Sequence, residues 1–257
     1  MSFTIQNMEF YLLVLIRVSS FVLTAPFFSY QAVPHRMKAA VSIMLSIIII
    51  QMVPAVQLSY NGVFGFSALV LKEALVGAVL GFMCALCFYI VHFSGQVVDM
   101  EMGLSMATMF DPTSNIQISV TGNMYNYFLM LTLLVTNSHY YIIRAVTDSF
   151  RYFNVGQAVI RVDGLKALII EFMANYFLLA VRIVLPVIGC MLLINVVLGV
   201  LAKAAPQMNM FVVGMQIKVL VGIMILVMLV QTLPAISELV FSEMKEVVTQ
   251  VVGVFRP

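Results

Sequence analysis

Long apolar stretches recur along the chain, and they constrain its fold more than any other feature of the sequence. A helix rises about 1.5 Å per residue and the hydrocarbon core of a bilayer is about 30 Å thick, so about 20 residues suffice to cross it. Six stretches approach or exceed this length, near residues 10–28, 39–58, 63–98, 124–143, 165–202 and 210–236. The sequence therefore predicts an all-α, polytopic integral membrane protein, with residues 1–257 as a single membrane domain.

The composition of the chain agrees with this class. Of its 257 residues, 63% are hydrophobic and 9% are charged, whereas an ordinary soluble domain has about 25% charged residues. A soluble enzyme is thereby excluded, and membrane lipid is the expected surrounding. The formal net charge is only +2 and no basic cluster follows the chain, so we expect no nucleic-acid partner.

The stretches 63–98 and 165–202 are too long for one simple crossing. Pro186 lies inside the second stretch, where its missing N–H and its ring can break the helix. If the chain crosses six times with both ends inside, the cytoplasmic connections carry more Lys and Arg residues than the outer ones. This distribution favours a cytoplasmic C-terminus.

Residues 237–257 are predicted to form an amphipathic helix that leaves the membrane. Polar side chains fall on one side of this helix, and apolar ones form a stripe on the other. The stripe consists of Val240, Met244, Val247, Val248 and Val251.

Signatures of catalysis and of metal or cofactor binding are missing from the sequence. It contains no HExxH motif, no G-x-S-x-G motif and no phosphate-binding glycine loop. Cys84, Cys87 and Cys190 lie in apolar runs, which favours packing over disulfide, redox or metal chemistry. Asp99 and Asp111 lie in a connector, where carboxylates are usually just hydrated. We therefore expect no enzyme, no catalytic residue, no metal and no cofactor.

Six ionisable residues lie in or at the edges of the apolar stretches. An ionised side chain there costs about 3 kcal/mol or more unless it is paired or hydrated. Two interpretations stay open: structural ion pairs between helices, or the lining of a hydrated, proton-sensitive path. The six residues are Arg17, Lys72, Glu73, Glu171, Arg182 and Lys218.

Glu171 and Arg182 are eleven residues apart, close to three helical turns, so they share a helix face. They are too far apart along that helix to pair directly. Their partners must come from another segment, another subunit or water. Elsewhere, Gly77 and Gly81 form a G-x-x-x-G pattern, which lets two helix backbones approach closely, so we expect a tight helix contact there.

Residues 99–123 form a connector that is too polar at its end to cross the membrane and too apolar at its start for an ordinary loop. Methionine is enriched in and next to it, and unbranched thioether side chains deform around irregular contents. Asp111 and Pro112 predict a turn. The segment therefore suits a compliant plug, the alternative being a connector packed on the membrane surface. The plug residues that we single out are Met102, Gly103, Met106, Met109, Phe110, Asp111 and Pro112.

The order and spacing of many residues resemble the FliR family, over about residues 10–240. FliR proteins and their SctT-type relatives are inner-membrane subunits of type III protein export gates. One departure is Met215-Gln216, where the family commonly has an aromatic residue followed by Pro. The resemblance rests on Arg17, Ala25-Pro26, Pro34, Arg36, Glu73, Gly77, Gly81, Gly95, Asp99, Gly103, Asp111-Pro112, Asn137, His139, Ala205-Pro206-Gln207-Met208-Asn209, Phe211, Gly214 and Lys218.

The resemblance implies a non-enzymatic subunit of the flagellar export gate, in the bacterial inner membrane at the flagellar basal body. It implies a fold of long helices and hairpins resembling a fusion of FliP and FliQ. In such a gate the chain joins FliP and FliQ in a heteromeric helical ring, through which unfolded flagellar proteins are exported, with FlhB and FlhA as cytoplasmic partners. The connector would be the plug of the closed channel.

Two other functions remain open on the residues alone. Six spans with intramembrane charges would suit a small-molecule or ion carrier equally well, although we find no inverted repeat that would favour it. A scaffold for assembly, with no path of its own, is the second alternative.

Overall fold

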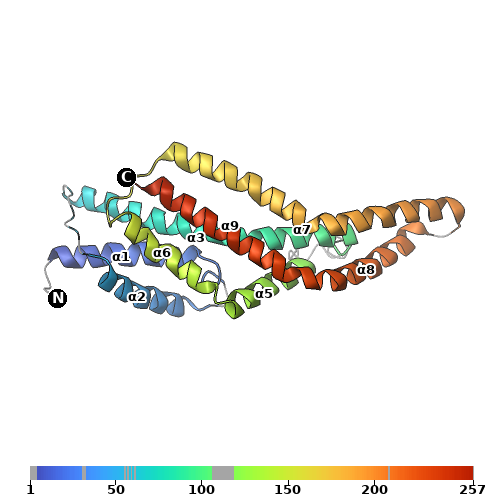
Figure 1. The fold of residues 1–257 in the computed structure, drawn as a ribbon, viewed down its shortest axis with the longest axis horizontal. Helices are drawn as coiled ribbons and strands as arrows, with labels where there is room; N and C mark the ends of the chain where they lie inside the picture. Colours follow the sequence, from blue (N-terminus) through green and yellow to red (C-terminus); the bar gives the residue numbers. More distant parts are fainter. Residues whose placement is uncertain are drawn as a thin grey trace. The chain divides into compact units, whose positions relative to one another are not determined.

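The computed structural model describes residues 5–30, 33–54, 56, 58, 60, 62–105, 119–207 and 209–256, with only the backbone described at residues 5–7 and 210. Within these ranges the chain forms helices and no strand (Figure 1). The all-α prediction is therefore confirmed. The elements are α1 (Ile5–Thr24), α2 (His35–Met52), α3 (Gly62–Met102), α5 (Val120–Val135), α6 (His139–Tyr152), α7 (Val162–Ala204), α8 (Met210–Leu229), the 3₁₀ turn η1 (Val230–Thr232) and α9 (Leu233–Phe255).

Among the described residues, four stretches are long and apolar enough to cross a membrane. They are His35–Met52, Gly62–Met102, Val162–Ala204 and Phe211–Phe255. The chain is thus a polytopic, membrane-embedded protein, as its apolar stretches predict. Helices α3 and α7 have 41 and 43 residues, about twice what a single crossing needs.

The prediction that residues 124–143 form one membrane crossing is wrong, because this stretch contains parts of two helices. Helix α5 ends at Val135 after 16 residues, and α6 begins at His139. Between them Asn137 adopts a left-handed backbone conformation with φ of 56°, which asparagine tolerates better than most residues. The hydroxyls of Thr136 and Ser138 are hydrogen-bonded at 2.8 Å, so three consecutive polar residues interrupt the apolar run.

Pro186 does not break its helix. Helix α7 runs without interruption from Val162 to Ala204 with Pro186 inside it. Membrane helices tolerate an internal proline because neighbouring groups can satisfy the backbone carbonyl that it leaves free. The break that the sequence allows at this residue therefore does not occur.

The chain divides into two compact units, which we describe separately. Unit 1 comprises Met1–Cys87, Thr136–Met173 and Phe241–Pro257. In unit 1, α1 and α2 lie side by side (Figure 1). The hydroxyl of Tyr60 donates a 2.7 Å hydrogen bond to Oε1 of Glu9, which joins the segment before α3 to α1 and raises the pKa of Tyr60.

Gly77 and Gly81 of α3 face α1 in unit 1. A Cβ atom at Gly77 would collide with the carbonyl oxygen of Arg17, and one at Gly81 would lie 2.7 Å from the carbonyl oxygen of Phe21. Both contacts are with backbone, which cannot move aside as a flexible side chain can. The two helices therefore approach so closely that only glycine fits at these positions.

Unit 2 comprises Phe88–Val135 and Ala174–Val240. The hydroxyl of Ser94 on α3 donates to the carbonyl oxygen of Ala180 on α7 at 3.3 Å, and the hydroxyl of Tyr176 donates to the carbonyl oxygen of Tyr89 at 3.1 Å. A Cβ atom at Gly95 would lie 2.8 Å from the carbonyl carbon of Thr121, so α3 and α5 also meet backbone to backbone. These contacts hold α5 and α7 against the second half of α3.

Candidate functional site

Two groups of predicted site residues have a defined geometry, one in each unit. In unit 1, Arg17 of α1 and Glu73 of α3 form an ion pair, with Nε of Arg17 2.5 Å from Oε2 of Glu73. Both side chains are fully buried. The second carboxylate oxygen, Oε1, accepts a 2.8 Å hydrogen bond from the backbone N–H of Gly156, in the turn that follows α6.

The guanidinium of Arg17 has further contacts on α6 and the turn after it. Its Nη1 donates to the hydroxyl of Ser149 at 3.3 Å. Its central carbon lies 4.1 Å from the ring centre of Phe150 and 4.7 Å from that of Phe153, within the range of cation–π attraction. Among the described residues its Nη2 has no hydrogen-bond partner. Arg17 and Glu73 thus join α1, α3 and α6, and both ends of the pair are largely satisfied.

The other four intramembrane charges lie differently. Lys72 and Lys218 are partly exposed, whereas Glu171 and Arg182 are exposed. In the described part of the chain none of the four belongs to an ion pair. Glu171 lines a cavity of about 390 Å³ in unit 1, whose lining also includes Arg161.

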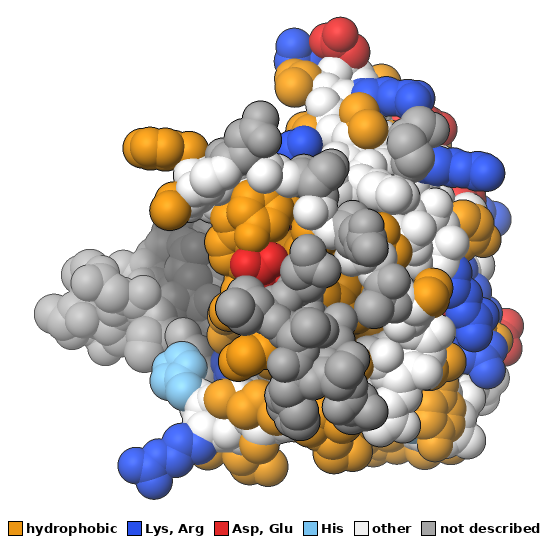
Figure 2. Space-filling model, turned by 90° about the vertical axis from the view of Figure 1, so that its left-hand side faces the viewer, with side chains coloured by type: hydrophobic (Ala, Val, Ile, Leu, Met, Phe, Trp, Pro, Cys, Tyr) orange, Lys and Arg blue, Asp and Glu red, His pale blue; other side chains and the backbone are white. Residues whose placement is uncertain are grey.

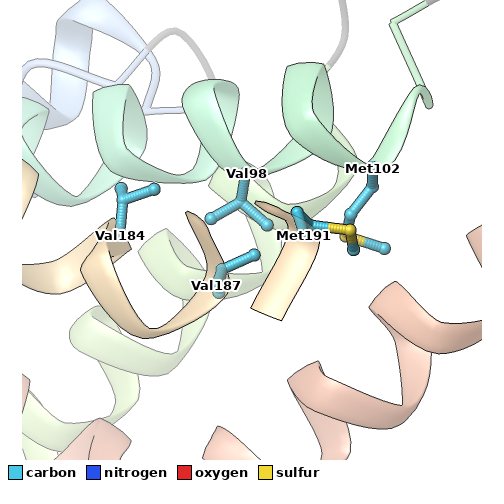
Figure 3. Packing of buried hydrophobic residues seen from close by; sticks show 5 residues of the cluster. All are labelled: Val98, Met102, Val184, Val187 and Met191. Atoms are coloured by element: carbon cyan, nitrogen blue, oxygen red, sulfur yellow. The ribbon is translucent and has the colours of Figure 1, made fainter. Parts of the chain in front are cut away.

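In unit 2 the residues of interest surround the point where the connector leaves α3. Met102, the last residue of α3, is buried in a cluster with Val98 and three residues of α7, namely Val184, Val187 and Met191 (Figure 3). The side chains of Met102 and Met191 extend toward one another in this view.

Helix α8 closes the same cluster. A Cβ atom at Gly222 would lie 2.6 Å from Cε of Met102 and 2.8 Å from Cε of Met191. The two thioether side chains therefore occupy the space that a side chain on α8 would need. Met102 is a fixed anchor where α3, α7 and α8 meet.

Gly103 ends α3. Its φ of 81° lies in the left-handed region that glycine adopts without strain, and its N–H donates to the carbonyl oxygen of Met100 at 3.1 Å. The N–H of Leu104 donates to the carbonyl oxygen of Asp99 at 2.9 Å. This arrangement is a glycine-ended helix terminus, and it turns the chain away from the axis of α3.

Asp99 binds the other end of the connector. Its side chain, expected to be hydrated, is only 4% exposed. Its carboxylate accepts a 2.7 Å hydrogen bond from the hydroxyl of Ser119, and further bonds from the hydroxyl of Thr121 and from the N–H of Thr121 at 3.2 Å. The hydroxyl oxygen of Ser119 in turn accepts a 2.9 Å hydrogen bond from the N–H of Gly122.

Asp99 thus caps the start of α5, where free N–H groups and the helix dipole favour a carboxylate. We call Asp99, Ser119 and Thr121 the clamp. Because Asp99 lies one turn before the end of α3, the clamp brings the two ends of the connector together. The remaining plug residues, Met106, Met109, Phe110, Asp111 and Pro112, lie outside the described residues.

The three cysteines are unpaired thiols: Cys84 and Cys87 are buried and Cys190 is exposed. Within the described residues no group of His, Cys, Asp and Glu side chains could hold a metal ion. The chemistry of the described part is therefore that of buried charge, capping and apolar packing.

The sequence of this chain is similar to those of known bacterial proteins. The family model described as "Bacterial export proteins, family 1" matches residues 8–244. The flagellar biosynthetic protein FliR of Escherichia coli K12 is 30% identical over 241 residues, which cover 93% of this chain and 91% of that protein. FliR of Bacillus subtilis 168 is 29% identical over 237 residues, 90% of each chain.

A relative with a different name also matches. The surface presentation of antigens protein SpaR of Shigella sonnei is 31% identical over 159 residues, covering 62% of this chain and 60% of that protein. The chain is thus similar both to flagellar biosynthetic proteins and to a protein named for the surface presentation of antigens.

Proposed function

This chain belongs to the bacterial export proteins, family 1, and from this premise we propose that it is a FliR-type subunit of a type III protein export apparatus. In this role it lies in the bacterial cytoplasmic membrane, at the flagellar basal body, with its C-terminus on the cytoplasmic side. It acts without catalysis, as part of a passage for unfolded flagellar proteins.

The proposal includes a heteromeric ring with FliP and FliQ, served by FlhB and FlhA. Its support from the structure is one helix, α7, and the charge that this helix exposes. Of the most apolar window in Val162–Ala204 only 22% is buried within the chain, and that helix exposes Arg182. Lipid can cover apolar side chains, but an ionised arginine in a membrane needs a polar partner. A neighbouring subunit supplies such a partner.

The observation that carries the proposed role of the connector is that both of its ends are anchored. Asp99 holds Ser119 and Thr121, and Met102 is anchored between α7 and α8. A segment that closes a channel must be fixed where it begins and ends while its middle yields to a passing chain. We propose that residues 104–118 are this plug, with Met106, Met109 and Phe110 as its apolar seal.

Deletion of residues 104–118 tests the plug. The parent and the deletion variant are expressed with their partner subunits, and the complex is purified and placed in liposomes loaded with an ion-sensitive dye. We expect the deletion complex to assemble and to leak ions, because the constriction loses its apolar filling. An assembled deletion complex as tight as the parent would contradict the plug.

A matched pair of double substitutions separates polarity from length. Met106→Ser with Met109→Ser should give a weaker leak, because water wets a polar constriction. Met106→Leu with Met109→Leu keeps the apolar character and should remain tight. Equal leakage from both pairs would show that thioether packing, rather than exclusion of water, is what matters.

A further inference from the structure

A cavity of about 250 Å³ lies in unit 1 between α6 and α9, with Cys84 of α3 at its base. A water molecule occupies roughly 30 Å³ in the liquid, so the cavity has room for a group much larger than one water. Neither the buried ion pair of Arg17 and Glu73 nor the anchored ends of the connector line this cavity. Its lining joins residues of two kinds.

The polar part of the lining carries an excess of positive charge. Arg144 of α6 and Lys245 of α9 both line the cavity, from different helices. Nζ of Lys245 lies 3.9 Å from the ring centre of Tyr141, so the ring orients the ammonium group. Within the described part of the chain, no carboxylate forms an ion pair with Arg144 or Lys245.

Asp148 is the acidic residue of the lining, and it already has a cation. Nη1 of Arg151, which does not line the cavity, lies 3.4 Å from Oδ1 of Asp148. This pair is exposed and screened by solvent, but the lining still holds two cations against one carboxylate. Arg144 and Lys245 are left to attract an anion.

The other part of the lining is apolar. Ile142 and Ala145 of α6 and Met244 of α9 are buried side chains of this wall, together with Cys84. A small soluble anion would gain nothing from such a wall. An amphiphile would use both parts, its anionic group at the two cations and its first methylenes on the apolar wall.

We propose that this cavity binds the headgroup of an anionic phospholipid, with the phosphate held by Arg144 and Lys245. Basic pockets between helices are a recurrent mode of lipid recognition in membrane proteins. The surface around such a site must tolerate charge and apolar groups together. On the face drawn in Figure 2, Lys and Arg side chains lie next to hydrophobic ones, so charged and apolar groups share a surface of this chain.

The test uses the full chain within its purified membrane complex, in a mild detergent. Native mass spectrometry measures the retention of phosphatidylglycerol against phosphatidylcholine of the same acyl composition, added in equal amounts. The parent should prefer phosphatidylglycerol. Arg144→Gln with Lys245→Gln should lower that preference about 30-fold, because each basic residue near an anionic lipid surface strengthens binding by a factor of about five and the two factors multiply.

The matched control is Lys166→Gln with Arg256→Gln. These two residues are exposed and do not line the cavity, and their substitution removes the same total charge as the cavity variant does. The control should retain the parent's preference. A second variant, Tyr141→Leu, leaves the charge unchanged and removes the ring beneath Lys245, so it should give an intermediate loss.

Several results would overturn the proposal. A parent without preference for the anionic lipid would do so, and so would a control that loses as much as the cavity variant. Glycerol phosphate that displaces the lipid at equal concentration would assign the cavity to a soluble anion. A cavity variant that keeps its lipid but loses a partner subunit would assign the two cations to a protein contact. None of these outcomes depends on whether the connector is a plug.

Discussion

Arg17 is a fully buried arginine whose charge is balanced inside its own chain. The pair with Glu73 is surrounded by Ser149, the N–H of Gly156 and two aromatic rings, although Nη2 of Arg17 has no hydrogen-bond partner among the described residues. This geometry favours a structural ion pair over a hydrated path at this point of the molecule. Burying two charges is costly even when they are paired, and a single buried charge without its counterion is costlier still.

Single substitutions at this pair should therefore destabilise the protein much more than the double substitution does. Arg17→Met or Glu73→Gln alone should lower the free energy of unfolding by about 3 to 5 kcal/mol, because the remaining group is left unpaired. Arg17→Met with Glu73→Leu should restore most of the loss. Unfolding in a detergent titration, followed by circular dichroism, measures the three values.

The exposed pair of Asp163 and Lys166 provides the control, since solvent screens it. Its single substitutions should leave the unfolding transition unchanged. If the double variant at Arg17 and Glu73 is as unstable as the singles, then the pair is needed for more than charge compensation.

At the same scale, the sequence identified which residues are unusual but not what they touch. Arg17 and Glu73 stand out as ionisable residues in apolar stretches, yet they are 56 positions apart. Nothing in either stretch pairs them. Asp99 was misjudged for the same reason, because its partners Ser119 and Thr121 follow about 20 positions later, beyond the reach of any local pattern.

Helices were predicted well wherever an apolar run was long and uninterrupted. The stretches 63–98 and 165–202 lie inside α3 and α7, because hydropathy alone determines that such runs avoid water. The stretch 124–143 was misjudged because Thr136, Asn137 and Ser138 are too few to lower the average hydropathy of a 20-residue window. The break there depends on backbone conformation, which hydropathy does not measure.

The contact between α1 and α3 offers a test at the scale of elements. Gly81→Leu should sharply reduce recovery of the folded chain in its complex, because the new side chain would force the backbones of two helices apart. Size-exclusion chromatography of the solubilised complex measures the recovery.

Gly253→Leu is the matched control in unit 1, since a Cβ atom at Gly253 has open space around it. It should be recovered like the parent. Equal recovery of the Gly81 variant would mean that α1 and α3 can separate at no cost, contrary to the close approach described above.

At the scale of the whole molecule, some charges have no counterion among the residues that the structure describes. Arg182 is exposed on α7 within a stretch that is apolar enough to span the membrane. We expect a partner subunit to place a carboxylate or a polar group against it. Arg182→Leu should then reduce the yield of the heteromeric complex while the chain itself is still made and inserted.

Affinity purification through a partner subunit, with quantitative blotting of both chains, measures that yield. Arg151→Gln is the control, because Arg151 is exposed on α6, outside the candidate spans. A normal yield for Arg182→Leu would mean that no subunit pairs with Arg182. For Glu171, a variant Glu171→Gln that assembles normally but no longer supports export would favour a proton relay over an ion pair.

The clamp at Asp99 also bears on how this protein can change over evolutionary time. Because the two ends of the connector meet at one carboxylate, an insertion or deletion between them shifts neither α3 nor α5. The entropy of closing such a loop grows slowly, by about 0.6 kcal/mol for each doubling of its length. The length and sequence of the segment between these two ends can therefore change while the surrounding helices stay as they are.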